Sequence, residues 1–295
     1  MKTPPICDYE GSDYQESFWE QGNRAYEDAA EEIALKRLLP SGSGHLLELG
    51  AGAGRNTHRY QGFKHITLLD YSTTQLQRAI ERLGTDGKYR YVAADVYRLP
   101  FSPGVFSAAT MIRTLHHLSD PESALNQINE CLASGAVFIL EFANKRNIKS
   151  IVRYNFKQQE WNPFDHEPVE FVELNFDFHP ARVKEWLGQT GFRVDKQVSV
   201  SYLRADFFKR ALPLPIMRAF EHLLQSTLSW AAYSPSIFLS SQVISQNKPK
   251  SGNTFFRCPA CGHYPLRDTP PILICGKCGR EYPVKDGIYD FRIDQ

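Results

Sequence analysis

The sequence has no dominant charge and no uninterrupted hydrophobic run. Its 34 Lys and Arg residues stand against 33 Asp and Glu residues, which leaves a formal net charge of +1 over 295 residues. This balance gives no global electrostatic reason to expect a nucleic-acid or membrane partner. The N-terminus lacks the apolar core of a secretory signal. No residue from Leu223 to Asn247 is charged, but Gln, Ser and Pro residues interrupt that run, so no transmembrane segment is predicted. A cytoplasmic protein is expected.

Cysteines are few, and their placement argues against a disulfide framework. Of the six cysteines, four form two C-x-x-C pairs near the C-terminus, which leaves Cys7 and Cys131 as predicted free thiols. This distribution favours a metal site over disulfide bonds. Hydrophobic residues make up 42% of the chain, which is enough for one large packed domain beside a small one.

The residues from His45 to Asp70 carry the first positive signal. An apolar run ends in Gly50-Ala-Gly-Ala-Gly54, and a second apolar run ends at Asp70. This pattern predicts a strand, a glycine turn, a helix over residues 55–64, a second strand and a carboxylate. The glycines let a ligand press against bare backbone, the helix would direct its N–H groups at that ligand, and Asp70 can accept hydrogen bonds from a ribose diol. Half of a nucleotide-binding site is therefore predicted.

Three segments resemble class I S-adenosylmethionine-dependent methyltransferases. Glu48-Leu-Gly-Ala-Gly-Ala-Gly54 resembles the first motif of that family, with G-x-G-x-G spacing in place of G-x-G-x-x-G. Asp95 and Val96 resemble the position at which an acid meets the adenine amino group, and Arg113-Thr-Leu-His-His-Leu-Ser-Asp-Pro121 resembles the segment after the fourth motif. The resemblance spans roughly residues 20–246 and implies methyl transfer from S-adenosylmethionine by in-line displacement.

The motifs and the resemblance together predict the residues that bind the cofactor. They are Tyr26, Glu48, Gly50, Ala51, Gly52, Gly54, Asp70, Tyr71, Ser72, Asp95, Val96 and Arg113. Because the sulfonium already makes the methyl group electrophilic, the protein mainly has to align donor and acceptor, and few catalytic side chains are required. The catalytic residue stays unassigned, and the candidates for a general base are His116, His117, Glu141 and His179.

The order of the predicted elements defines the fold class. Helices are expected over residues 24–38 after an Asn23 cap, 73–83 after a Ser72 cap, 122–133 and 180–189. Strands are expected over residues 45–49, 65–70, 89–95, 105–112, 136–142, 192–200 and 236–245. This alternation predicts an α/β fold with a doubly wound seven-stranded sheet, Rossmann-like as in class I methyltransferases, whose seventh strand is antiparallel.

Two insertions interrupt the alternation. Residues 143–180 are rich in aromatics and asparagine, and residues 201–235 hold an amphipathic helix. Long insertions over a strand edge usually shape a substrate pocket. The polar candidates for that pocket are Glu170, Glu173, Asp177 and His179. The apolar stripe of the second insertion, from Ile216 to Ala231, is expected in the core or as a lid, with contact to lipid or an apolar substrate as the alternative.

The C-terminal cysteines predict a separate metal module. Cys258-Pro-Ala-Cys261 and Cys275-Gly-Lys-Cys278 are two matching turns that can place four thiolates around one ion. We expect structural Zn²⁺, with a rubredoxin-like iron site as the alternative, because four sulfur ligands leave no open position for catalysis. The chain then divides into an arm (1–22), a methyltransferase domain (23–246), a linker (247–254) and a zinc ribbon (255–295).

The second cysteine turn and Tyr282-Pro-Val-Lys-Asp-Gly-Ile288 resemble the zinc ribbon of a small activator subunit shared by tRNA, rRNA and translation-factor methyltransferases. The resemblance implies that this chain fuses the module to its catalytic partner. From residue 247 onward, 8 basic residues against 5 acidic ones give +3, which is too mild to establish RNA binding. A module that only stabilises the C-terminus or a dimer contact is the alternative.

Taken together, these features predict methyl transfer to a small or lipid-soluble acceptor. An rRNA or tRNA methyltransferase that uses the ribbon for RNA or partner binding is the first alternative. A scaffold that binds the cofactor without turnover is the second. The sequence decides neither the acceptor atom nor the oligomeric state.

Overall fold

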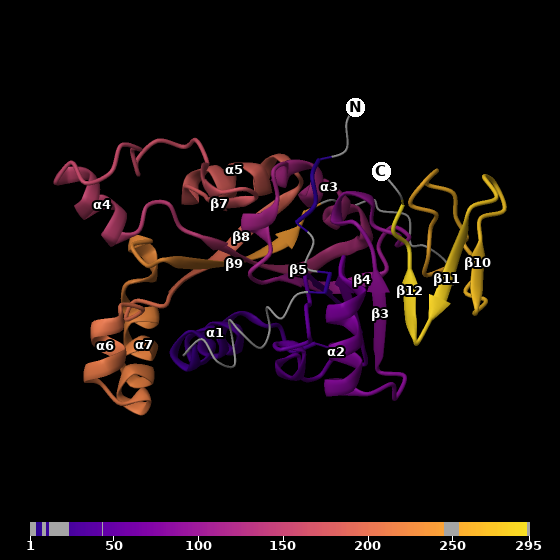
Figure 1. Cartoon of the computed structure of the whole chain (residues 1–295), viewed down its shortest axis with the longest axis horizontal. Coiled ribbons are helices and arrows are strands. Elements are labelled where there is room, and N and C mark those ends of the chain that lie inside the picture. The colour runs from indigo at the N-terminus through magenta and orange to yellow at the C-terminus, as the bar shows by residue number, and fades with distance from the viewer. Residues whose placement is uncertain (1–3, 8–9, 12–23, 43, 245–253, 294–295) are drawn as a thin grey trace.

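The computed structural model describes residues 4–7, 10–11, 24–42, 44–244 and 254–293 (Figure 1). The predicted arm over residues 1–22, the Asn23 cap and the 247–254 linker lie outside the described residues, apart from residues 4–7, 10–11 and 254. Within the described part, helices flank a central sheet.

Seven strands of this sheet match the predicted order. They are β1 (His45–Leu49), β2 (His65–Asp70), β3 (Tyr89–Ala93), β4 (Phe106–Met111), β5 (Leu132–Ala143), β8 (Phe192–Val200) and β9 (Ser236–Val243). Their order across the sheet is β3-β2-β1-β4-β5-β9-β8. β1 to β5 pair in parallel, whereas β9 pairs antiparallel with both β5 and β8. The predicted doubly wound sheet with an antiparallel seventh strand is therefore confirmed.

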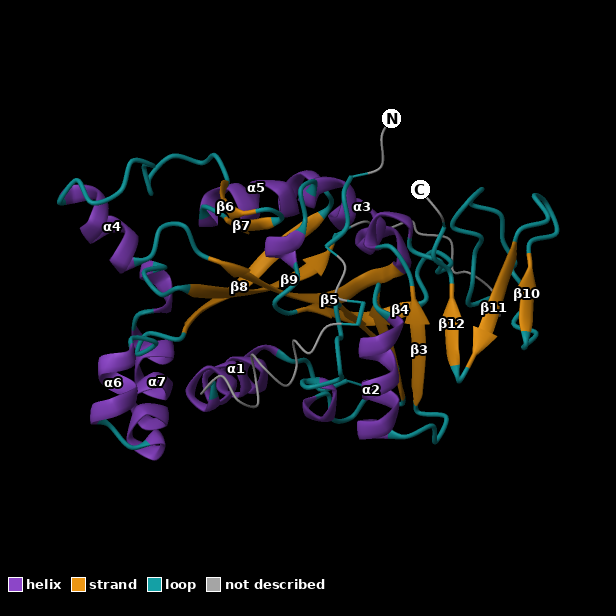
Figure 2. Ribbon diagram, in the orientation of Figure 1, coloured by secondary structure: helices purple, strands orange, loops and turns teal. Residues whose placement is uncertain are grey.

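Helices cover both faces of the sheet (Figure 2). α1 (Ala25–Leu38) and α2 (Thr73–Leu83) lie on one face, and α3 (Pro121–Cys131) and α5 (Pro180–Gln189) on the other. The predicted Ser72 cap is present, since its hydroxyl accepts the Gln75 N–H at 3.2 Å. An apolar core fills each side of the sheet, so the strands are buried on both faces, as parallel strands require.

The helix predicted over residues 55–64 is wrong. Only a 3₁₀ turn, η2 (Thr57–Arg59), forms there. Gly54 and Gly62 both have positive φ, 71° and 90°, so too few residues remain between them for a stable α-helix to form. No α-helix dipole therefore follows the glycine turn directly.

The first insertion contains α4 (Ile148–Asn155) and a hairpin of β6 (Val169–Val172) and β7 (Asn175–Asp177). The second contains α6 (Asp206–Ala211), α7 (Leu214–Thr227) and the 3₁₀ turn η5 (Ser229–Ala231). The apolar stripe of α7 was expected in the core or over the cofactor, and for most of its length this is wrong. The exposed residues of the stripe include Ile216, Phe220 and Leu223.

The cysteine module joins the sheet instead of standing apart from it. It contains β10 (Ile272–Ile274), β11 (Glu281–Lys285) and β12 (Ile288–Asp290). β12 pairs in parallel with β3, so the sheet continues from the larger domain into the module (Figure 1). Phe256, fully buried, packs with Phe101 and Phe291, and Arg257 Nε donates to the Leu99 carbonyl at 3.1 Å. The two parts therefore share one core.

Candidate functional site

The glycine turn forms one wall of a cavity at the carboxyl ends of β1 and β2. Gly50 and Gly52 have φ of 64° and 51°, which a residue with a Cβ rarely adopts. A Cβ on Gly50 would lie 2.0 Å from Thr114 Oγ1, whereas a Cβ on Gly52 would meet nothing within 4 Å. Gly50 therefore lets the turn pack against Thr114, and Gly52 leaves bare backbone facing open space.

Asp70 connects this turn to the next helix. Its carboxylate accepts the Gly52 N–H at 2.8 Å and the Ser72 N–H at 3.0 Å. These two bonds hold the carboxylate at the end of β2, on the wall of the cavity. The predicted acid after the second strand is thus in place and oriented by backbone donors.

Asp95 and Val96 lie after β3 at the same edge. Asp95 accepts the Tyr97 N–H at 2.8 Å at the start of η3 (Val96–Arg98). Burial raises the pKa of the Asp95 carboxyl above its ordinary value. Both residues line the same cavity as Asp70, so the carboxyl ends of neighbouring strands bring together two acids that are distant in sequence.

The cavity encloses about 1140 Å³ of space that continues into solvent. The predicted cofactor residues that line it are Glu48, Gly50, Ala51, Gly52, Asp70, Tyr71, Asp95, Val96 and Arg113. Further lining residues that sequence reasoning missed include Cys7, Gln75 and Tyr97. No motif in the sequence pointed to Cys7, and Gln75 and Tyr97 follow the Ser72 and Asp95 caps by only a few residues.

Tyr26, Gly54 and Ser72 are not among the described residues that line the cavity. The Tyr26 hydroxyl donates to the Glu221 carboxylate and accepts the Leu203 N–H at 2.8 Å, so it ties α1 to α7. Gly54 packs against the Leu83 side chain, and Ser72 caps α2. Each of the three predicted residues therefore has a structural contact outside the cavity wall.

Glu48, on β1, holds the segment that follows the glycine turn through two hydrogen bonds. It is 5% exposed and accepts hydrogen bonds from Thr57 Oγ1 at 2.6 Å and from Tyr60 Oη at 3.2 Å. Burial raises the pKa of the Glu48 carboxyl to about 7, although both hydroxyl groups oppose that rise. The carboxyl thus anchors η2 to β1 and keeps the glycine turn in register.

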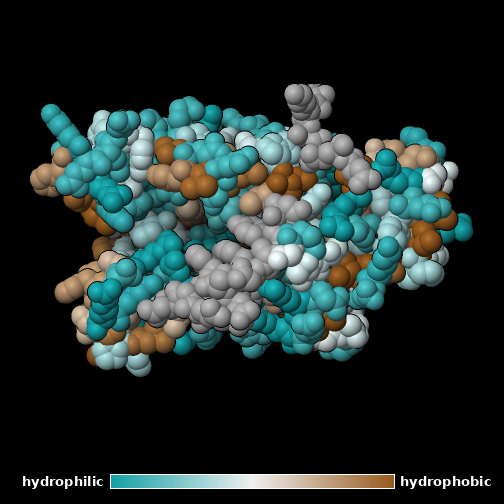
Figure 3. Space-filling view, viewed as in Figure 1, coloured by the Kyte–Doolittle hydropathy of each residue, from teal (hydrophilic) through white to brown (hydrophobic). Residues whose placement is uncertain are grey.

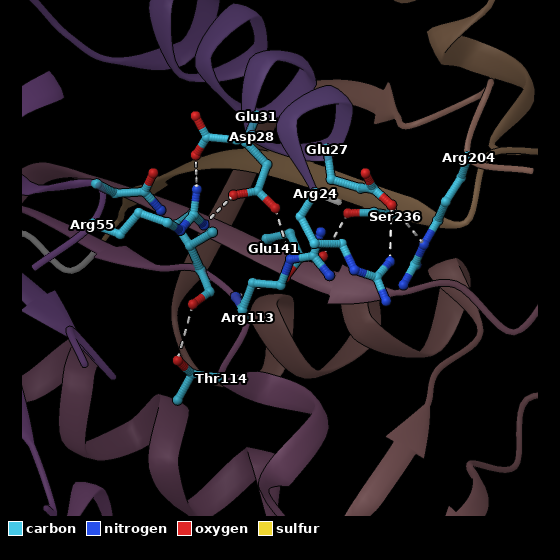
Figure 4. A network of polar contacts seen from close by, with 12 residues as sticks. Arg24, Glu27, Asp28, Glu31, Arg55, Arg113, Thr114, Glu141, Arg204 and Ser236 are labelled. Carbon is cyan, nitrogen blue, oxygen red and sulfur yellow. Dashed lines mark hydrogen bonds and ion pairs between the residues drawn. The ribbon is translucent and has the colours of Figure 1, made fainter. Parts of the chain in front are cut away.

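A buried network of charges forms the inner wall (Figure 4). The Arg113 Nε donates to Glu31 Oε1 at 2.7 Å, and the Arg113 N–H donates to Glu141 Oε2 at 2.8 Å. Glu31 also pairs with Arg55, which reaches Asp28 on the same helix. Arg113 has a φ of 59°, unusual for a residue with a Cβ, and these contacts from α1 and β5 hold it there.

The four candidate bases occupy different environments. Glu141 is 2% exposed, and its carboxylate accepts hydrogen bonds from Ser236 Oγ and from the Arg113 N–H. His179 Nδ1 accepts a hydrogen bond from the Ala181 N–H at 3.2 Å, at the start of α5. His117 lines the cavity, with Nδ1 2.9 Å from the Leu174 carbonyl oxygen. His116 Nδ1 is buried without a hydrogen-bond partner among the described residues, and burial lowers the pKa of His116 well below its ordinary value.

Asp177 is an ionisable group that does not line the cavity but lies on a strand next to η4 (Leu115–His117), which carries the cavity residue His117. It ends β7, which packs against β5 and against η4. Burial raises the pKa of the Asp177 carboxyl to about 6, against the attraction of Arg204 and with a smaller contribution from Glu141. A carboxyl with this pKa can exchange a proton near neutral pH.

The four cysteines of the C-terminal module come together. Their Sγ atoms all lie within 4.8 Å of one another, with Cys258 to Cys278 and Cys261 to Cys275 both at 3.7 Å. Four sulfurs around one tetrahedral zinc ion, with bonds of about 2.3 Å, lie about 3.8 Å apart. The sulfur spacing therefore fits a tetrahedral ion.

Known proteins resemble this chain over its central part. Residues 47–140 match a family model described as a methyltransferase domain. The O-methyltransferase cnsE of Penicillium expansum is 30% identical over 109 residues, which are 35% of this chain and 40% of that protein. The demethylmenaquinone methyltransferase of Chlamydia pneumoniae is 36% identical over 112 residues, which are 37% of this chain and 48% of that protein. The chain thus spans less than half the length of these two relatives.

Solved structures extend the likeness to most of the fold. A chain from the complex between the Haloferax volcanii Trm112 methyltransferase activator and the putative methyltransferase has a TM-score of 0.55 at 16% identity, covering 78% of this chain and 95% of that chain. A putative S-adenosylmethionine dependent methyltransferase from Listeria monocytogenes has a TM-score of 0.54 at 16% identity, covering 75% and 99%. The fold resembles that of these methyltransferases. The match to the methyltransferase domain model lies within this fold, at residues 47–140.

Proposed function

We propose that this protein transfers a methyl group from S-adenosylmethionine to a small or lipid-soluble acceptor. The observation that carries the proposal is the meeting of the bare Gly52 backbone, the Asp70 carboxylate and the Asp95 carboxylate on one cavity wall. This set matches a ligand with an amino acid or phosphate group, a ribose and a base, and the methyltransferase family of residues 47–140 selects S-adenosylmethionine among such ligands.

The roles of the cavity residues follow from what each can donate or accept. Asp70 is oriented to accept hydrogen bonds from a ribose diol, and Asp95 to accept one from the adenine amino group. Tyr71 and Val96 supply apolar surface for the nucleoside, and Arg113 stands at the inner end. The bound cofactor supplies an electrophilic methyl group, so the protein has to align the acceptor and exclude water.

Asp177 is our first choice for the group that removes a proton from the acceptor. Its pKa of about 6 keeps the carboxylate ionised at neutral pH and still basic enough to take a proton. His116 and His117 remain candidates on the same side. Glu141 and His179 are better explained as positioning groups, because their oxygen or nitrogen atoms already accept hydrogen bonds from the protein.

The module's own contacts favour a small acceptor over RNA. Arg257 pairs with Glu130 and Arg292 with Asp290, so these two cations of the module already have carboxylate partners. The names of the two relatives above, an O-methyltransferase and a demethylmenaquinone methyltransferase, point to small molecules. An RNA acceptor would instead require binding that weakens steeply with salt.

We further propose that Cys258, Cys261, Cys275 and Cys278 hold one structural Zn²⁺. Tyr282 Oη lies 3.0 Å from Cys258 Sγ and can hydrogen-bond a metal-bound thiolate. Elemental analysis of protein purified without chelator should give about one zinc per chain, and replacing Cys258 and Cys275 should remove it. Protein with no metal, or with iron, would contradict the assignment.

The domain limits stay proposals: a methyltransferase domain over residues 23–246 and a ribbon over residues 255–295 that share one sheet. None of the described helices is both long and apolar enough to cross a bilayer. A cytoplasmic location remains a prediction from the sequence.

Calorimetric titration with S-adenosylmethionine and S-adenosylhomocysteine tests the proposal. Native protein should bind both, and Asp95→Ala should weaken binding about tenfold to a hundredfold, because the hydrogen bond that the adenine amino group donates to an ionised acceptor is lost. Glu122→Gln, an exposed change in α3, is the control and should bind as the native protein does. Failure of the native protein to bind either compound would refute the proposal. Binding without turnover of any hydroxylated aromatic or quinol acceptor would favour the scaffold alternative.

A further inference from the structure

The two insertions present apolar side chains to solvent at one end of the molecule. On α4 and at the residue that follows it, these side chains recur every four residues: Ile148, Val152 and Phe156 are 56%, 44% and 73% exposed. Each is followed by an exposed cation: Lys149, Arg153 and Lys157. A stripe of apolar residues with a stripe of cations beside it is typical of helices that lie at a membrane surface.

α7 also turns its apolar stripe outward, and its hydrogen bonds hold it in that orientation. Glu221 and Gln225 occupy the buried face, where Glu221 accepts the Ser201 N–H at 2.7 Å and Gln225 Nε2 donates to the Ala30 carbonyl at 2.9 Å. Rotating the helix to bury Phe220 and the rest of the stripe would leave these polar groups without partners. The exposure of the stripe is therefore built into the fold.

The apolar surface continues from α7 to α4. Phe207 on α6 is 74% exposed and Trp230 on η5 is 81% exposed. The Ile148 N–H donates to the Tyr233 carbonyl at 2.9 Å, which places the start of α4 beside the residues that follow η5. α4 lies at the upper corner and α6 and α7 at the lower corner of the end opposite β10 to β12 (Figure 1), and hydrophobic patches are visible at this end in the space-filling view (Figure 3). We call this surface, on α4, α6, α7 and η5, the insertion face.

The charge of the insertion face is strongly biased, unlike that of the chain as a whole. Residues 144–157 and 204–233 together hold nine Lys and Arg residues and two acidic residues, Asp206 and the buried Glu221. Several of these cations pair with carboxylates of other segments, among them Lys145 with Asp165, Lys209 with Glu27 and Arg218 with Glu32. The exposed cations of α4 and of the residues after it, Lys149, Arg153 and Lys157, remain in excess. The exposed apolar tip of the β6–β7 hairpin, in contrast, is flanked by Glu170 and Glu173, so it is not part of this face. Exposed apolar side chains and exposed cations therefore coincide on the insertion face.

We propose that the insertion face binds the surface of an anionic lipid bilayer. Aromatic side chains such as Phe207 and Trp230 enter the interface between headgroups and acyl chains, while the neighbouring cations pair with anionic headgroups. A second copy of the chain suits this face less well, because a two-fold contact would place two cationic surfaces against each other. The proposal is independent of the methyl-transfer proposal, since it uses none of the cavity residues.

Sedimentation of the full chain with vesicles tests the proposal. The protein should sediment with vesicles of phosphatidylcholine and phosphatidylglycerol and much less with phosphatidylcholine alone. Phe207→Ser with Trp230→Ser should lower the partition coefficient about a hundredfold or more. Lys149→Gln with Arg153→Gln should lower it about thirtyfold on anionic vesicles only.

Ile272→Ser with Ile274→Ser is the matched control, because these exposed apolar residues lie on β10 at the opposite end. This pair should bind vesicles as the native protein does, and all variants should keep the native melting temperature. The proposal is overturned if native protein does not sediment with anionic vesicles or if the control pair loses as much binding as the aromatic pair. It is equally overturned if the protein is a dimer that the aromatic substitutions dissociate while vesicle binding is absent.

Discussion

Glu31 offers a direct test of the buried charge network behind the cavity. Its carboxylate is 1% exposed and lies between Arg55 and Arg113. Burial by itself raises the pKa of Glu31, but the two guanidinium groups outweigh burial and hold the pKa at about 2, against 4.5 for an ordinary glutamate. This difference corresponds to about 3 kcal/mol. Glu31→Gln should therefore lower the free energy of unfolding near pH 7 by about 3 kcal/mol, measured by urea denaturation.

The pH dependence of that loss distinguishes the charge from the packing. Because the pKa of Glu31 is lower in the folded state than in the unfolded state, its stabilisation is present above about pH 4.5 and is lost as the pH falls toward 2. The difference between native protein and Glu31→Gln in the free energy of unfolding should therefore narrow progressively as the pH falls from 5 toward 2.

Glu32→Gln is the control for that experiment, since Glu32 lies on the same helix and pairs with Lys36 and Arg218 at the surface. Such exposed pairs contribute about 0–1 kcal/mol. Equal losses for Glu31→Gln and Glu32→Gln, or a difference that stays constant on acidification, would refute the reasoning.

Three further perturbations test other parts of the account. Cys258→Ser with Cys275→Ser should release zinc and unfold the module, and because β12 pairs with β3 it should also lower the melting temperature of the whole chain; an unchanged melting temperature would contradict the shared sheet. Asp177→Asn should raise the free energy of unfolding by about 3 kcal/mol near pH 8 and leave it unchanged near pH 3, because the raised pKa of Asp177 means that ionisation destabilises the folded state; equal stability in urea denaturation at both pH values would disprove it. Gly52→Ala should cost about 1 kcal/mol of stability through its positive φ, yet weaken cofactor binding in calorimetry far more than that, whereas Gly50→Ala should mainly destabilise because its Cβ would meet Thr114; similar profiles for the two would count against the assigned cavity wall.

The parts of the fold governed by local chemistry could be predicted from the sequence. The glycine turn follows from residues that tolerate positive φ, and the placing of Asp70 and Asp95 at one edge follows from parallel strands of similar length. The Ser72 cap likewise needs only its own side chain and the next turn of helix. These features depend on short stretches of chain, so the sequence pattern was sufficient.

The errors have two causes, one within the predicted segment itself and one in contacts with distant residues. The helix predicted over residues 55–64 failed because a glycine at either end left too short a segment to form a helix. The stripe on α7 was placed in the core because hydrophobic periodicity assumes that the apolar face is buried. Glu221 and Gln225 are buried instead because they form hydrogen bonds with Tyr26 and with the Ala30 carbonyl, both on α1. No pattern within α7 reveals these partners.

The pairing of β12 with β3 could not be predicted from the sequence either. It joins Ile288 to Tyr91 through backbone pairing that leaves no side-chain signature. The cysteine spacing predicted the metal cluster but not its attachment to the sheet. The predicted linker suggested a separate module, whereas Phe256 and Arg257 anchor it within the core of the larger domain.

A crystal structure of the full chain with bound S-adenosylhomocysteine tests the central claim most directly. The account predicts the ribose hydroxyl groups on Asp70, the adenine amino group on Asp95 and the sulfur directed toward the space between Arg113 and Asp177. A ligand bound elsewhere on the chain, or bound here with its adenine and ribose away from both carboxylates, would contradict it.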